Sequence, residues 1–142
     1  MKRGRVLIVD DEPDVLLLLR IELEAEGYDT LLAADGETAI RRIIEERPDI
    51  VLLDVMMPVV DGWGVLQRLA EHGSTTRVIV LSAKASDSDV ARALELGAHE
   101  YVTKPFDAAA LLVTVAHVLA SSPADLEAGR LRRLQNLSRA NS

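Results

Sequence analysis

The chain has 142 residues, of which 49% are hydrophobic and 27% charged, with a formal net charge of −7 and no cysteine. This size suits one domain with a genuine core, and the composition is that of a globular protein. The missing cysteines exclude disulfides and thiolate metal sites, and the acidic balance argues against a nucleic-acid surface. No apolar run is long enough for a membrane span or for the core of a signal peptide.

The first half of the chain predicts alternating strands and helices. In chain order we expect a strand at Val6–Val9, a helix at Asp14–Glu26 ended by Gly27, a weak strand at Asp29–Ala33, a helix from Asp35 or Gly36 that stops at Pro48, and a strand at Ile50–Leu53. The last of these is uniformly apolar, which is typical of a strand covered on both faces, and it leads into Asp54.

The second half continues the alternation. We expect a loop with Pro58 and Gly62, a short helix to about Glu71, a strand at Val78–Leu81 ending at Ser82, a helix at Asp87–Leu96 between Ser86 and Gly97, a strand at Glu100–Thr103, a fifth helix from Asp107 to about Ser121, and a further helix over residues 124–138 after Pro123. Five strand–helix units with short connections predict an α/β fold: a doubly wound, five-stranded parallel sheet of flavodoxin-like order 2-1-3-4-5, with a C-terminal helical extension.

Polar residues gather where the predicted strands end. Ligands of such sheets bind beyond the carboxyl ends of the strands, at the point where strand order reverses. Asp10 and Asp11 follow the first strand, Asp54 the third, Ser82 the fourth and Lys104 the fifth. Clustered carboxylates call for a cation, and Mg²⁺ is the natural one for oxygen ligands. The set favours a metal or phosphate site in which a carboxylate can be the nucleophile, although a single Asp at a strand end is usually a helix cap or a solvated loop residue.

Four segments together resemble the receiver domain of two-component response regulators. They are Val6-Leu7-Ile8-Val9-Asp10-Asp11-Glu12-Pro13, Leu53-Asp54-Val55-Met56-Met57-Pro58 with Asp61-Gly62, Leu81-Ser82-Ala83-Lys84, and Tyr101-Val102-Thr103-Lys104-Pro105-Phe106. The resemblance covers roughly residues 4–121 and implies a receiver domain over 1–122, with 123–142 as a helical tail or linker. It implies a phosphorelay switch rather than a turnover enzyme.

The resemblance assigns the phosphoryl and metal chemistry to particular residues. Asp54 would accept a phosphoryl group from a histidine kinase or a histidine phosphotransfer protein. Asp11 and Asp54 would bind Mg²⁺ together with the backbone carbonyl of Met56, and Asp10 would act through water or from the second layer of ligands.

The same resemblance implies how the phosphoryl group is sensed. Ser82 would donate a hydrogen bond to the phosphoryl group, and Lys104 would pair first with Asp54 and then with the phosphate. Tyr101 would be a switch that turns inward when Ser82 moves. The Lys104–Pro105 peptide bond would be cis.

The sequence predicts less about how the switch passes its signal on than about how it accepts the phosphoryl group. No effector domain fits between the fifth helix and residue 142. We expect output through a protein contact if this sequence is complete, whereas in a longer protein an effector domain would follow residue 142. We expect a location in the cytoplasm, with no nucleic acid or membrane bound directly. Residues 108–122 carry no Asp, Glu, Lys or Arg. Such a helix is either a partner or homodimer face, or it is covered by the 124–138 segment.

Three rival functions remain. A haloacid-dehalogenase-type phosphohydrolase needs a second Asp two residues after the nucleophile, where this chain has Met56. A flavin or nucleotide module needs a phosphate cradle after the first strand, where Asp10 and Asp11 would repel phosphate. A degenerate receiver that only binds proteins would not need the site residues that are present.

Overall fold

The structure is a computed structural model that describes residues 3–57, 61–84 and 86–140, with the backbone alone at residue 140, so the predicted loop position Pro58 lies outside the described residues. Its elements in chain order are β1 Arg5–Val9, α1 Pro13–Ala25, β2 Asp29–Ala33, α2 Gly36–Glu46, β3 Ile50–Asp54, α3 Gly62–Glu71, β4 Arg77–Ser82, α4 Asp87–Glu95, β5 Glu100–Thr103, α5 Ala108–Ala120 and α6 Pro123–Ala140. The predicted elements are all present, with ends shifted by a few residues at most.

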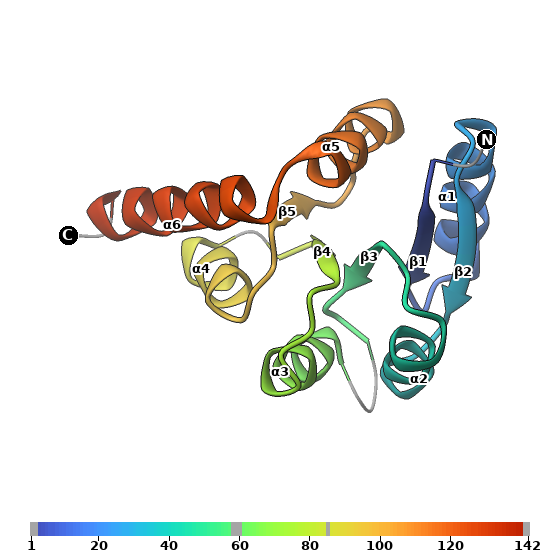
Figure 1. Ribbon diagram of the computed structural model, residues 1–142, viewed down its shortest axis with the longest axis horizontal. Helices are drawn as coiled ribbons and strands as arrows, with labels where there is room; N and C mark the ends of the chain where they lie inside the picture. Colours follow the sequence, from blue (N-terminus) through green and yellow to red (C-terminus); the bar gives the residue numbers. More distant parts are fainter. Residues whose placement is uncertain (1–2, 58–60, 85, 141–142) are drawn as a thin grey trace.

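The five strands form one sheet in the order β2-β1-β3-β4-β5, and every neighbouring pair is parallel. This confirms the predicted doubly wound topology. The strand order reverses between β1 and β3, which pair from Val6 with Ile50 to Val9 with Leu53. Since all strands run the same way, their carboxyl ends share one edge of the sheet (Figure 1).

The strands are apolar on both faces because helices cover both. Alternate strand residues divide between two hydrophobic clusters. One cluster joins Leu7, Val51 and Val80 to α2, α3 and α4, and the other joins Ile8, Leu52 and Ile79 to α1 and α5. The sheet is therefore the middle layer of three, which is why its strands contain no alternation of polar and apolar residues (Figure 1).

Side-chain caps fix where most of the described helices begin. Asp35, Asp61, Ser86 and Asp107 accept hydrogen bonds from backbone N–H groups in the first turns of α2, α3, α4 and α5. Pro123 is the first residue of α6, because the first turn of a helix needs no N–H from that position.

α6 packs chiefly against α4 and extends outward past β5, the strand at one edge of the sheet (Figure 1). It therefore does not cover the length of α5. The inner side of α5 buries Leu111, Val115 and Val118 against the sheet and α1, while Val113 remains 70% exposed. Among the described helices, none combines the length and the apolar character needed to cross a bilayer.

Candidate functional site

The buried polar or charged residues of the described chain are Asp10, Asp54 and Ser82, with exposed fractions of 0%, 3% and 0%. All three stand at the carboxyl ends of strands: Asp10 after β1, Asp54 at the end of β3 and Ser82 at the end of β4. Burying such groups is costly unless they have partners. Their concentration at one edge, in an otherwise apolar interior, marks the place where the fold supports chemistry.

Lys104 joins the two buried carboxylates. It follows β5, and its Nζ lies 2.6 Å from Oδ2 of Asp10 and 3.3 Å from Oδ2 of Asp54. The other oxygens are also held, since Asp10 Oδ1 accepts from the Glu12 N–H at 2.9 Å and Asp54 Oδ1 accepts from the Met56 N–H at 2.8 Å. Both carboxyl groups are thus fixed in orientation, and one ammonium group bridges them.

The pKa values of Asp54 and Lys104 are both raised, for different reasons. Burial raises the pKa of Asp54 above its ordinary value, although the Met56 N–H and the charge of Lys104 act in the opposite direction. Burial alone would lower the pKa of Lys104, but its hydrogen bond with Asp10 and the charges of Asp10 and Asp54 outweigh that effect, so this pKa is raised. Lys104 therefore stays cationic, and the buried acidic pair still favours additional positive charge.

The buried Asp10 and the exposed Asp11 and Glu12 offer oxygen ligands for that charge. Carboxylate oxygens of Asp10, Asp11 and Glu12 all lie within 4.8 Å of one another, and the Glu12 Oε1 atom is 4.0 Å from the Lys104 Nζ atom. Clustered carboxylates beside a buried acidic pair fit a hard divalent cation such as Mg²⁺. Glu12 was not among the predicted metal ligands. Its position directly after Asp10 and Asp11 is the sequence feature that could have indicated it. The Met56 thioether is a soft ligand that does not suit Mg²⁺, so only its backbone carbonyl could serve this metal.

Ser82 and Tyr101 are connected through Lys84. Ser82 Oγ accepts a hydrogen bond from the Lys84 N–H at 3.0 Å, and the Tyr101 hydroxyl donates to the Lys84 carbonyl. The Tyr101 ring is buried, with 6% exposed, and this burial raises the pKa of its hydroxyl. The ring thus lies inward in this structure, and its predicted role as a switch stays a prediction. Lys84 is a further residue that the sequence analysis missed as a link, although it lies only two positions after Ser82.

The Lys104–Pro105 peptide bond is cis. The chain turns there from β5 toward α5, and the Lys104 N–H donates to the Ser82 carbonyl at 2.8 Å. Asp10, Asp54, Ser82 and Lys104 therefore come together at one edge, with Asp11 on the exposed side and Tyr101 one contact further away.

Gly62 allows the chain after β3 to return close to the site. A Cβ atom at this position would lie 2.4 Å from Val55 Cα and 2.5 Å from the Asp54 carbonyl oxygen.

We expect Gly62→Ala to cost about 2 kcal/mol in the free energy of unfolding, because backbone would have to move. Gly129→Ala is the matched control, since its nearest neighbour would be a flexible Arg132 nitrogen at 3.9 Å; in α6 it should stabilise by up to about 1 kcal/mol. Urea unfolding of both variants measures this, and equal stabilities would contradict the close approach.

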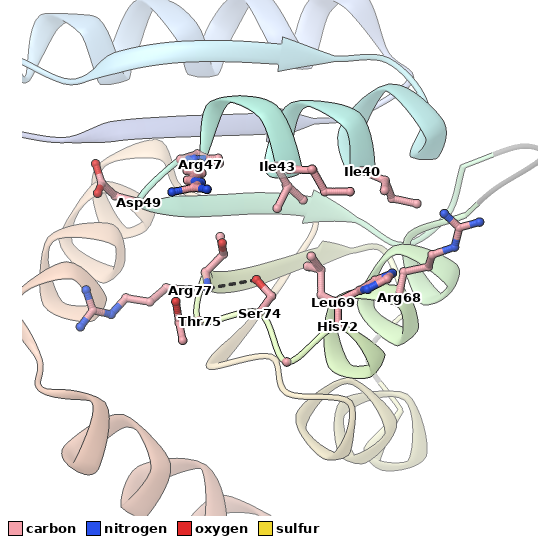
Figure 2. A pocket seen from close by; sticks show the side chains of 14 residues that line it. Ile40, Ile43, Arg47, Asp49, Arg68, Leu69, His72, Ser74, Thr75 and Arg77 are labelled. Atoms are coloured by element: carbon pink, nitrogen blue, oxygen red, sulfur yellow. Dashed lines mark hydrogen bonds between the residues drawn. The ribbon is translucent and has the colours of Figure 1, made fainter.

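A groove of about 690 Å³ lies at the opposite edge of the sheet, between α2 and α3. Ile40 and Ile43 face Leu69 and His72 across it, near the beginnings of β3 and β4 (Figure 2). Arg77 borders it but directs its guanidinium away, to the Ser121 carbonyl at 2.8 Å. None of the predicted site residues lines this groove.

Comparisons with known proteins agree with the fold. The family model for the response regulator receiver domain matches residues 6–116. The chain is 42% identical over 102 residues to the alkaline phosphatase synthesis transcriptional regulatory protein PhoP of Bacillus subtilis, covering 72% of this chain and 42% of the relative. The chain thus spans less than half of that relative's length.

Solved structures give the same result. The receiver domain of the Francisella response regulator 1452 superposes with a TM-score of 0.79 at 32% identity, over 82% of this chain and 97% of that one. The BeF3-activated DrrB receiver domain gives 0.77 at 30% identity, over 85% and 100%. From the buried acidic pair, the parallel sheet and these matches it follows that the chain belongs to the response regulator receiver domain family.

Proposed function

We propose that Asp54 is the phosphoacceptor of a two-component phosphorelay and that its phosphorylation, with Mg²⁺, changes a protein-binding surface. The observation that carries the proposal is the pair Asp10 and Asp54, both buried and bridged by Lys104 Nζ at 2.6 and 3.3 Å. A nucleophilic carboxylate needs fixed orientation and nearby positive charge to receive an anionic group. Asp54 has both.

The transfer balances with a phosphohistidine donor on a histidine kinase or phosphotransfer protein. A carboxylate oxygen of Asp54 attacks phosphorus, the P–O bond forms, the P–N bond breaks, and the imidazole leaves and takes up a proton. Lys104 pairs with the added negative charge and Ser82 donates its hydroxyl hydrogen to a phosphoryl oxygen. When bound by Asp11, Asp54 and the Met56 carbonyl, with Asp10 and Glu12 nearby, Mg²⁺ supplies charge neutralisation and orients the phosphoryl oxygens.

The rival functions fit the site less well. In a dehalogenase-type hydrolase the residue two after the nucleophile would transfer protons, and the Met56 side chain has no titratable group. A degenerate receiver would gain nothing from burying Asp54 beside Asp10. We therefore propose a regulatory switch in the cytoplasm, with residues 1–122 as the receiver unit and 123–142 as its helical extension. We propose no direct binding of nucleic acid by this chain, whose formal net charge is −7. A homodimer through α5 stays a prediction.

The test is phosphoryl uptake from a small donor. Incubation of the protein with acetyl phosphate and Mg²⁺ should add one phosphoryl group, read by intact-mass measurement, and chelation of Mg²⁺ should prevent it. The DrrB receiver is described as BeF3-activated, so beryllofluoride with Mg²⁺ is a suitable second probe. Failure of both probes to modify or occupy the folded protein would exclude the phosphoacceptor role.

A further inference from the structure

The groove of about 690 Å³ between α2 and α3 adjoins a second hollow of about 370 Å³, since Ile40, Ile44 and Arg68 line both. Their lining residues on the α2 side run from Glu37 to Asp49, so the two hollows follow the whole of α2. A helix of 11 residues is about 16 Å long. Each hollow has the volume of an ordinary binding site, and their combined length suits an elongated occupant.

The floor of the groove is apolar and partly open to solvent. Ile40 and Ile43 point across it toward Leu69 (Figure 2). One turn after Ile40, the Ile44 side chain is 62% exposed, and among the described large hydrophobic residues only Val113 is more exposed. Apolar surface that lines a hollow on the outside of a protein marks an interaction site.

Two guanidinium groups border this floor without a partner. Arg47 and Arg68 stand at opposite ends of the groove (Figure 2). Within the described residues, neither side chain makes a hydrogen bond, an ion pair or a ring contact. Arg77 also borders the groove, but a main-chain carbonyl holds its guanidinium elsewhere. The lining carboxylate, Asp49, is engaged as well, because its Oδ2 accepts the Arg5 N–H at 2.8 Å. The groove therefore offers positive charge that the described chain does not use.

These charges select an acidic occupant. A guanidinium group pairs with a carboxylate through two parallel hydrogen bonds, so unpartnered arginines favour carboxylates. The formal net charge of −7 opposes an acidic partner at long range. That repulsion is screened beyond about 8 Å at physiological ionic strength, so the nearest charges decide. In the second hollow Arg41 and Arg68 face Glu37 and Glu45, which leaves the excess of positive charge in the larger groove.

We propose that the groove between α2 and α3 is the docking site for an acidic amphipathic helix of a partner protein. The apolar face of that helix covers the isoleucines of α2 and Leu69, and its carboxylates pair with Arg47 and Arg68. A helix that lies in a groove in this way presents apolar anchors at i, i+3, i+4 and i+7. About three turns of it match the length of α2.

Docking here is independent of phosphorylation. The groove lies near the beginning of β3, whereas Asp54 is the last residue of that strand. Five strand residues place about 13 Å between the two ends. A partner in the groove therefore leaves the acidic edge of the sheet free, and Asp54→Asn should bind the partner helix as the wild type does.

The experiment uses a fluorescent, capped synthetic peptide of about 14 residues, with leucines at i, i+3, i+4 and i+7 and glutamates beside them. Fluorescence anisotropy follows its titration with the whole 142-residue protein. We expect saturable binding with a dissociation constant below about 1 mM. The same peptide with lysine in place of each glutamate should bind about 10-fold more weakly or worse. In NMR spectra of the protein, amide shifts should change over residues 36–49 and 68–77.

Variants of the groove test the charge and the apolar floor separately. Arg68→Gln and Ile44→Ser should each weaken peptide binding by about 10-fold. Arg47→Gly should weaken it too and keep the fold, because the φ of 46° at this position suits glycine. Arg132→Gln and Leu131→Ser are the matched controls, since these exposed residues of α6 lose the same groups away from the groove.

Several outcomes would overturn the docking site. They are no saturation by about 1 mM peptide, equal binding of the lysine peptide, amide shifts confined to other helices, and equal affinities for the groove and control variants. Sedimentation that shows self-association, abolished by Arg68→Gln, would instead assign the groove to a second copy of this chain. The phosphoacceptor proposal is tested apart from these results, because phosphoryl uptake by intact mass does not depend on peptide binding.

Discussion

Asp54→Asn is expected to take up no phosphoryl group from acetyl phosphate and Mg²⁺ under conditions in which the wild type takes up one. The amide is a poor nucleophile and carries no charge for Mg²⁺, yet it keeps the size of the carboxyl group and can still accept the hydrogen bond from the Met56 N–H. Intact-mass measurement over a time course quantifies the loss, which we expect to be complete.

Two controls show that this loss is chemical. Asp35→Asn removes a carboxylate that follows β2 at the same edge of the sheet. Asp35 caps α2 by accepting a hydrogen bond from the Thr38 N–H at 2.8 Å. Because asparagine caps a helix about as well as aspartate, the Asp35→Asn protein should retain phosphoryl uptake. The Asp54→Asn protein should unfold at a temperature no lower than the wild type when Mg²⁺ is chelated, because burial already disfavours the charged form of Asp54. Undiminished uptake by Asp54→Asn would move the acceptor to another residue.

Lys104→Ala is expected to lower the free energy of unfolding by about 3 kcal/mol when Mg²⁺ is chelated. The side chains of Asp10 and Asp54 are 1% and 4% exposed, and the bridging ammonium is the cation that both contact in the structure. Removing one partner of a buried ion pair leaves the other charge uncompensated. Urea unfolding with EDTA measures the loss.

Mg²⁺ should restore part of this stability, since it brings another cation to the same carboxylates. We expect Lys104→Ala still to bind Mg²⁺ but to take up phosphoryl groups more slowly, because the positive charge that pairs with the phosphate is gone. Lys84→Ala is the matched control: its side chain is exposed, and its backbone contacts with Ser82 and Tyr101 survive the change. Loss of Mg²⁺ stabilisation in Lys104→Ala, or a stability equal to that of Lys84→Ala, would contradict the bridging role.

The strands and their order followed from local pattern. A short run that is apolar on both faces, such as Ile50–Leu53, predicts a strand of a sheet that is covered on both sides. The alternation of strands with helices predicts that this sheet is parallel. Parallel strands share one carboxyl edge, which is why Asp10, Asp54, Ser82 and Lys104 could be expected together before any contact was known. Helix caps at Asp35 and Ser86 are likewise local, since each bonds within its own first turn.

The sequence by itself determined the sheet, its order and the edge at which the polar groups collect, because these depend on periodicity and on neighbours along the chain. Only the tertiary structure decided that Lys104 bridges Asp10 and Asp54, that Tyr101 reaches the Lys84 carbonyl, and that α6 docks on α4 rather than over α5. These contacts join residues from 17 to 94 positions apart. Their geometry depends on how whole layers pack, and no local pattern contains that information.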